Sequence, residues 1–220
     1  MNLASDVVSF SISLGLLFAY HGYLRYRLRK NPAYTVQSVN QLVRTAWVHD
    51  IMHRRDGILA VQTLRNSMMA ATFLASTAVL MIVGVLTLSE QGDKLRTTWQ
   101  VFNEFGTADP RLWLIKMLLL LVDLVFAFFS FAMAIRLFHH TGYMISAPQN
   151  ANLAAADPAH VSAHLNRAGF FYSIGMRAYY YTVPLLFWLF GPHFMLAGTV
   201  ALVISLFFLD RMPRLPAAAS

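Results

Sequence analysis

Two pairs of histidines, each spaced four residues apart, are the first residues in this chain that could do chemistry. His49 and His53 form one H-x-x-x-H pair, and His160 and His164 form the other. Four residues apart on a helix, two imidazoles share one face, and Asp56 falls on the face of His49. Imidazole with carboxylate suits zinc, iron, nickel or copper. One interpretation is therefore a transition-metal site that these five residues form at a cytoplasmic surface.

A second interpretation of the same stretch needs no metal. The glutamate of the H-E-x-x-H metalloprotease motif is missing. Val43, Trp47 and Ile51 form an apolar face roughly opposite the histidines, which is typical of an amphipathic helix on a membrane surface. Both interpretations stay open. Haem binding through His21 and His139 is less favoured, because neither has a transmembrane partner at matched depth.

A polar stripe runs through the apolar segment "KMLLLLVDLVFAFFSFAMAIR". Lys116, Asp123 and Ser130 recur every seven residues, and Ala127 and Ala134 fall beside them. A carboxylate at the depth of Asp123 costs several kcal/mol unless it is paired, hydrated or protonated. The stripe predicts either an ion or proton pathway or a structural carboxylate that fixes helix register.

Arg177 is the natural partner for this carboxylate. It lies between "GFFYSIGM" and "AYYYTVPLL", and its long side chain could reach Asp123. The alternative is that Arg177 extends to the cytoplasmic headgroups beside Tyr179, Tyr180 and Tyr181, which would form an aromatic belt. Both remain hypotheses.

The composition decides which elements must position these residues. Of the 220 residues, 57% are hydrophobic and only 12% are charged, and the mean hydropathy is +0.52. Soluble domains carry about twice that charge. The sequence predicts an all-α, polytopic transmembrane helix bundle in a single domain. With no cysteine, any metal site must use His, carboxylate or Met.

Five apolar segments are predicted to be membrane helices: 7–28, 67–88, 112–137, 168–190 and 192–209. The first lacks a basic start and is too long for a signal peptide, so it is expected to span. The total is four if the start of 168–190 lies on the surface. A cytoplasmic interfacial helix is expected between the first two segments.

Capping residues and small residues indicate where helices begin, end and touch. Asp157-Pro158 predicts a helix start, and Gly191-Pro192 predicts one helix ending where another begins. Small residues three or four apart mark close helix packing. One such row is Ser11, Gly15, Ala19 and Gly22, and another is Ser67, Ala71 and Ala75.

Basic residues between the first two segments predict the orientation. By the positive-inside rule this region is cytoplasmic, so the N-terminus faces outward. The loop 89–111, with three basic and four acidic residues, is expected outside. The flank would contact anionic lipid. Because the basic residues cluster at the ends of apolar segments, the net charge of +7 does not make nucleic acid an expected partner. The basic residues are Arg25, Arg27, Arg29, Lys30, Arg44, Arg54, Arg55 and Arg65.

Three stretches together resemble a known family: "YHGYLRYR", "VQTLRNSMMAATFLAS" and "GMRAYYYTVPLLFWLFGP". The chain is similar over nearly its whole length to a bacterial and plant family catalogued as domain of unknown function five hundred and ninety-nine. The resemblance implies an integral inner-membrane protein and supplies no activity or ligand. It also implies that Arg65, Asn66, Arg177 and Gly191-Pro192 belong to the family pattern.

These observations predict a homo-oligomeric ion channel or transporter-like protein of a bacterial inner membrane. A subunit of 24.8 kDa is too small to enclose a wide path, whereas several copies could line one with the stripe of 112–137. The alternative is a metal- or haem-binding redox or accessory subunit of a larger membrane complex. No P-loop, G-x-S-x-G motif or Rossmann fingerprint argues for an enzyme.

Overall fold

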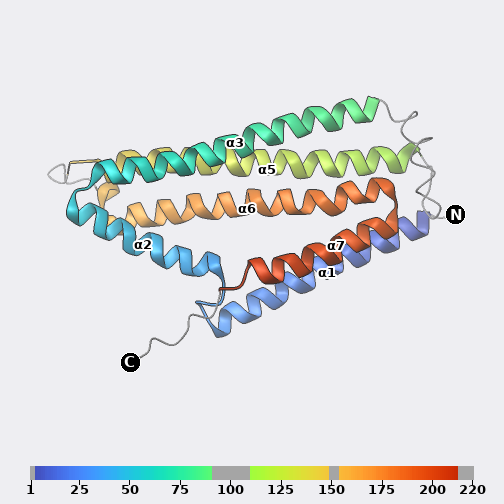
Figure 1. Cartoon of the computed structure of the whole chain (residues 1–220), viewed down its shortest axis with the longest axis horizontal. Helices are drawn as coiled ribbons and strands as arrows, with labels where there is room; N and C mark the ends of the chain where they lie inside the picture. The colour runs from blue at the N-terminus through green and yellow to red at the C-terminus, as the bar shows by residue number, and fades with distance from the viewer. Residues whose placement is uncertain (1–2, 91–109, 149–153, 213–220) are drawn as a thin grey trace.

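The described part of the chain is built from helices. The computed structural model describes residues 3–90, 110–148 and 154–212. A short 3-10 helix, Ala154–Ala156, precedes α6. The predicted all-α bundle is confirmed (Figure 1). The α-helices are α1 (Leu3–Lys30), α2 (Val36–Arg54), α3 (Gly57–Glu90), α5 (Pro110–Ile145), α6 (Pro158–Phe190) and α7 (Pro192–Leu209).

Four of these helices are long and apolar enough to cross a membrane. They are Ala4–Lys30, Gly57–Glu90, Arg111–Ile145 and Pro192–Leu209. They contain the predicted segments 7–28, 67–88, 112–137 and 192–209. Helix α6 contains the fifth segment, 168–190, but is not among the four. The predicted outer loop, apart from its ends, lies outside the described residues.

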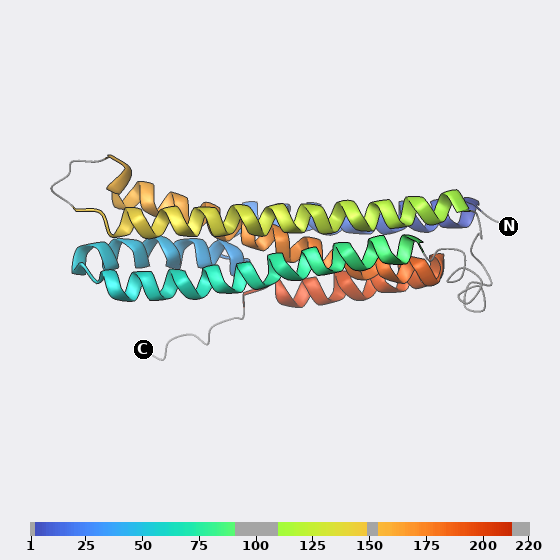
Figure 2. The same ribbon diagram turned by 90° about the horizontal axis from the view of Figure 1, so that it is seen from above.

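The helices form two halves that share α3, α5 and α6 (Figures 1 and 2). These three run side by side along the whole molecule, with α5 packed on both α3 and α6. In one half, α7 packs between α6 and α1. In the other half, α2 continues away from the end of α1 and packs against α6. Helix α6 therefore contacts a different set of neighbours in each half.

A helix is present as α2 between the first two apolar segments, and one side of it is covered. Thr35 caps its N-terminus by accepting a hydrogen bond from the Ser38 amide. Val48, Ile51 and Met52 are buried in a core that α3, α5 and α6 share. Val48 and Ile51 lie three residues apart, as one buried helical face requires. Helix α2 is thus part of a packed helical extension of the membrane bundle.

Both predicted helix boundaries are confirmed. Asp157 caps α6 by accepting a hydrogen bond from the Ala159 amide, with Pro158 at the first helical position. Gly191 ends α6 with φ 149°, a conformation that side chains disfavour, and Pro192 starts α7. This break turns the chain back, so that α7 runs antiparallel to α6 (Figure 1).

Small residues make the helix contacts tight at some places and leave others open. Ala71 and Ala75 of α3 are buried, which agrees with the predicted packing row. The row on α1 behaves differently: Ser11, Gly15 and Ala19 are exposed, as is Gly22. The small face of α1 therefore has no neighbour within the described part of one chain.

Gly175 and Gly84 form a matched pair for testing the α5–α6 contact. A Cβ at Gly175 would lie 2.7 Å from a ring carbon of buried Phe131, whereas one at Gly84 meets nothing within 4 Å. Gly175→Ala is expected to lower the stability by about 1–3 kcal/mol, the usual cost of overpacking. Gly84→Ala should leave it unchanged or raise it, because alanine favours helix. Thermal unfolding in detergent measures both, and equal midpoints would contradict the contact.

Candidate functional site

Three groups of polar side chains lie at successive heights along α6. Their α6 members are Trp188, Thr182 and Arg177, and the partners come from α1, α5 and α7. Eleven residues separate Trp188 from Arg177, which is about 16 Å along a helix. We call them the upper, middle and lower layers, with the upper layer nearest Gly191. Polar groups within apolar helices are costly and need partners, so each layer constrains the helices around it.

The upper layer is a buried ion pair held by a tryptophan. Lys116 Nζ lies 3.0 Å from Asp6 Oδ1, and the two side chains are 4% and 0% exposed. The Trp188 indole N–H donates to the same carboxylate oxygen at 2.8 Å. Lys116 also donates to the Trp188 carbonyl oxygen at 3.1 Å. The carboxylate and the ammonium are thus both hydrogen-bonded, which a buried pair requires.

The middle layer contains a carboxylate without a cation. The Thr182 hydroxyl lies 2.8 Å from Asp123 Oδ2. Asp123 is half-buried and makes no ion pair within the described residues. Ser130, the next residue of the predicted stripe, donates to the Phe126 carbonyl of its own helix. Asp123 and Ser130 are therefore not joined by a hydrogen bond.

The stripe on α5 faces α6 of the same chain. Ala127 and Ala134 are fully buried. Ala127 packs in a cluster with Phe131 and Ala178, the last of which belongs to α6. Lys116 and Asp123 likewise reach α6 at Trp188 and Thr182. The polar stripe thus lies inside the subunit.

The lower layer corrects the predicted partner of Arg177. Its guanidinium binds Asp210 in a bidentate pair, with Nη2 2.9 Å from Oδ1 and 2.8 Å from Oδ2. Asp210 caps the C-terminus of α7, which runs antiparallel to α6 and so returns to Arg177. The Tyr20 hydroxyl lies 2.7 Å from Asp210 Oδ2. Arg177 therefore pairs with Asp210 rather than with Asp123.

His21 belongs to the same layer, and its partners define its tautomer. Nδ1 lies 2.8 Å from the Leu17 carbonyl oxygen, which can only accept, so Nδ1 carries the proton. Nε2 lies 3.1 Å from Arg177 Nη1 and 3.0 Å from the Tyr181 hydroxyl. Nε2 of the neutral ring is thus the acceptor of both. Both ring nitrogens are engaged, so His21 in this arrangement offers no ligand to a haem.

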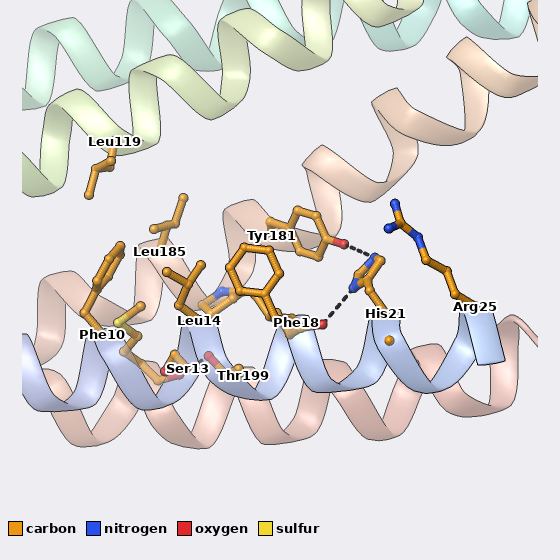
Figure 3. A pocket seen from close by; sticks show the side chains of 14 residues that line it. Phe10, Ser13, Leu14, Phe18, His21, Arg25, Leu119, Tyr181, Leu185 and Thr199 are labelled. Atoms are coloured by element: carbon orange, nitrogen blue, oxygen red, sulfur yellow. Dashed lines mark hydrogen bonds between the residues drawn. The ribbon is translucent and has the colours of Figure 1, made fainter.

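A cavity of about 550 Å³ lies beside the lower layer, between α1, α6 and α7. Its walls are mostly apolar, with Phe10, Leu14 and Leu185 toward one end. His21 and Tyr181 lie toward the other end, joined by the hydrogen bond drawn in Figure 3. The cavity has the size and mixed lining of a small-molecule site.

The comparisons with known proteins place the chain in a family. A family model described as Protein of unknown function, DUF599 matches residues 8–214. The chain belongs to this family. No curated protein and no solved structure matches it. The DUF599 match covers all three polar layers, except that it begins just after Asp6.

The predicted metal ligands of this DUF599 protein lie on α2, in the turn before α3, and on α6. His49 and His53 are exposed on α2. Asp56 is exposed too, and its Oδ1 accepts from the Leu59 amide at the start of α3. The rings of His160 and His164 lie 4.9 Å apart on α6. Among the described residues, no three His, Asp or Glu side chains are grouped as a metal site would need.

His164 is nevertheless in an unusual environment. Its Nδ1 is buried and has no hydrogen-bond partner within the described part of the chain. Burial lowers the pKa of His164, and the nearby His160, Arg167 and His140 lower it further. A neutral imidazole is favoured at this position.

Sequence reasoning missed two acidic partners, Asp6 and Asp210. Both lie near the end of an apolar segment, where a charge can reach water. Each instead faces a cation from another helix. The sequence did offer one signal, the scarcity of acidic residues in and beside the apolar segments. Because so few are present, each of them is a candidate partner for a cation within the membrane.

Mutation of the upper layer tests whether its ion pair stabilises the bundle. Asp6→Leu or Lys116→Met alone is expected to cost about 3–5 kcal/mol, because each leaves one charge buried without its partner. The double variant should recover much of that loss. Thermal unfolding in detergent gives the coupling between the two. The control is Asp50→Asn with Arg54→Gln, an exposed pair (51% and 69%) expected to show no measurable coupling. Additive losses at Asp6 and Lys116 would contradict the pairing.

Proposed function

We propose that this DUF599 protein is an ion- or proton-conducting membrane protein, channel- or transporter-like, whose path follows the α5–α6 contact. The observation that carries the proposal is the series of three polar layers on α6. Ionisable groups inside membrane helices are costly, and they commonly mark ion pathways or proton relays. The spacing of about 16 Å between Trp188 and Arg177 covers roughly half of a hydrocarbon core about 30 Å thick.

Asp123 is the group best suited to exchange an ion or a proton. The upper and lower carboxylates are held by Lys116 and Arg177, so their charges are compensated. Asp123 has only the neutral Thr182 hydroxyl among its described hydrogen-bond partners. A carboxylate without a fixed counter-charge can take up a cation or a proton and release it. The upper and lower layers would then lie at the two ends of the path.

The cavity beside the lower layer supports an entry route. It is lined by His21 and Tyr181 at the lower layer and by Leu119 of α5. The cavity therefore reaches from the lower layer to α5, the helix that carries Asp123. Hydroxyl and imidazole groups lining such a space are able to solvate an ion or relay a proton.

We also propose a homo-oligomer. The exposed face of Ser11, Gly15, Ala19 and Gly22 on α1 supports it, because small residues at such spacing let two helices approach closely. No Cβ contact would be made at Gly15 or Gly22 within the described chain. An oligomer would bury this face while leaving each α5–α6 path within its own subunit.

The proposed topology has five crossings, with the N-terminus outside a bacterial inner membrane. Helix α6 links the end of α5 to the start of α7 and packs along both. If α5 and α7 both cross, α6 must cross between them. The basic flank from Arg25 to Arg65 then lies in the cytoplasm with the extension that contains α2. The alternative, a metal- or haem-binding subunit, gains no support from the described residues.

Cysteine labelling tests the topology cleanly, because the chain has no cysteine of its own. Asn31→Cys lies in the exposed turn between α1 and α2, and Glu90→Cys lies at the exposed end of α3. In intact cells, a membrane-impermeant maleimide should label position 90 and label position 31 only after permeabilisation. The reverse pattern would overturn the proposed orientation.

Flux measurements in proteoliposomes test the path. Under an imposed membrane potential, the wild-type protein should conduct protons or a small cation, followed with ion-sensitive dyes. Asp123→Asn is expected to reduce the rate at least about tenfold, or 1.4 kcal/mol of barrier. Thr77→Ala is the control, because that hydroxyl on α3 donates to the Phe73 carbonyl of its own helix.

Two results would count against these proposals. Unchanged flux in Asp123→Asn would remove the path from the α5–α6 contact. A native mass spectrum showing only the 24.8 kDa monomer, from the preparation used for flux, would contradict the oligomer.

A further inference from the structure

A second candidate site lies in the other half of the molecule, around Arg44 of α2. The Arg44 Nε donates to Asn166 Oδ1 at 2.9 Å. The Asn166 amide donates in turn to the Thr45 hydroxyl at 3.0 Å, which fixes the orientation of the amide group. Arg44 is half-buried. It makes no ion pair within the described residues, so its positive charge is uncompensated there.

Two cavities meet at this guanidinium. The larger, of about 660 Å³, lies between α2, α3 and α6 and is lined by polar groups including Asn40, Asn66, Ser67 and Ser173. The smaller, of about 490 Å³, lies between α2 and α6 and is also lined by a second cation, Arg167. No carboxylate from the described residues lines either cavity. Both spaces therefore offer hydrogen-bond donors and positive charge without a competing anion.

Gly169 leaves room for the Arg44 guanidinium because it has no side chain. A Cβ on Gly169 would lie 2.7 Å from both Cζ and Nη1 of Arg44. The guanidinium thus lies directly against the α6 backbone, beside the larger cavity that Gly169 also lines. Such a fixed fork is ready to bind an anion without first being ordered.

Burial makes an anion favourable at this position. Burial lowers the pKa of Arg44, which means that the surroundings disfavour the charged guanidinium. Arginine keeps its charge in proteins, so the cost is relieved by a counter-ion. An oxyanion would accept two parallel hydrogen bonds from the guanidinium, and the neighbouring amides and hydroxyls would serve its other oxygens.

We propose that the cavities at Arg44 form a binding site for a phosphate group. The site lies where the predicted membrane segments 67–88 and 168–190 begin, since Ser67 and Gly169 both line the larger cavity. This is the level of lipid headgroups as well as of the aqueous phase. The phosphate could come from an anionic phospholipid or from a soluble phosphate compound, and the recognition chemistry is the same for both. The proposal does not depend on the path along α5 and α6.

The experiment uses the full-length protein in a neutral detergent. One arm adds inorganic phosphate, compared with chloride at the same ionic strength. The other arm adds phosphatidylglycerol, compared with diacylglycerol, which lacks the phosphate. In at least one arm the phosphate-bearing probe should raise the unfolding midpoint by about 3 °C or more at saturation. In the lipid arm, native mass spectrometry should show a retained phosphatidylglycerol.

Three variants distinguish binding from a structural role. Arg44→Gln should abolish the midpoint rise, and Gly169→Ala should weaken binding about tenfold by displacing the guanidinium. Arg54→Gln is the matched control: it removes one positive charge from the same helix at an exposed ion pair and should respond like the wild type. Because the readout is the difference with and without probe, a general loss of stability does not imitate the result.

The two arms also identify the source of the phosphate. A rise with inorganic phosphate assigns a soluble ligand, and a rise with phosphatidylglycerol alone assigns a lipid headgroup. No rise in either arm, or an equal rise in wild type and Arg44→Gln, would overturn the proposal.

Discussion

The cost of placing charge among apolar helices governs this structure, and α6 concentrates that cost. Helix α6 carries Arg177 and Thr182, and despite its 33 residues it is not among the four candidate spans. Its polar side chains are matched by groups from three other helices: Lys116 and Asp123 of α5, Asp6 and His21 of α1, and Asp210 at the end of α7. Apolar contacts alone would allow α1 and α7 to slide along α6, because leucine packs nearly as well against lipid as against leucine. The layers fix their positions.

How much of this the sequence predicts depends on whether a feature is local. Long apolar runs predicted the four spans, and the capping chemistry of Asp157-Pro158 and Gly191-Pro192 predicted helix boundaries that are confirmed. The partners of Arg177 and Lys116 are not local. They depend on helix orientation, on tilt and on the register between α6 and α7. The sequence therefore suggested Asp123 as a partner for Arg177, whereas the bidentate partner is Asp210.

Helix length is the other property that apolarity alone underestimates. Helix α3 begins at Gly57, ahead of the apolar segment 67–88. Helix α6 begins at Pro158, as its capping residues predicted, ahead of the apolar segment 168–190. The added turns bury Ala60, Leu64 and Val161 against α2. Their sequence is too polar to suggest a membrane helix, and it folds as helix because tertiary packing covers one side of it. The histidines of α2 then fall on the uncovered side, which explains their spacing without a metal.

The two proposed sites differ from the upper and lower layers in how a charge among apolar helices is compensated. In the upper and lower layers, charges that cost free energy to bury are paired with partners within the chain, and such pairs hold helices together. Asp123 and Arg44 differ from these pairs: among the described residues, Asp123 is a carboxylate without a cation and Arg44 is a guanidinium without a carboxylate. Under the two proposals, these charges would be compensated from outside the chain, by a proton or cation at Asp123 and by an anion at Arg44. Asp123 lies within the apolar bundle and Arg44 at its predicted cytoplasmic edge, so an ion at one and a phosphate at the other would meet the protein from different environments.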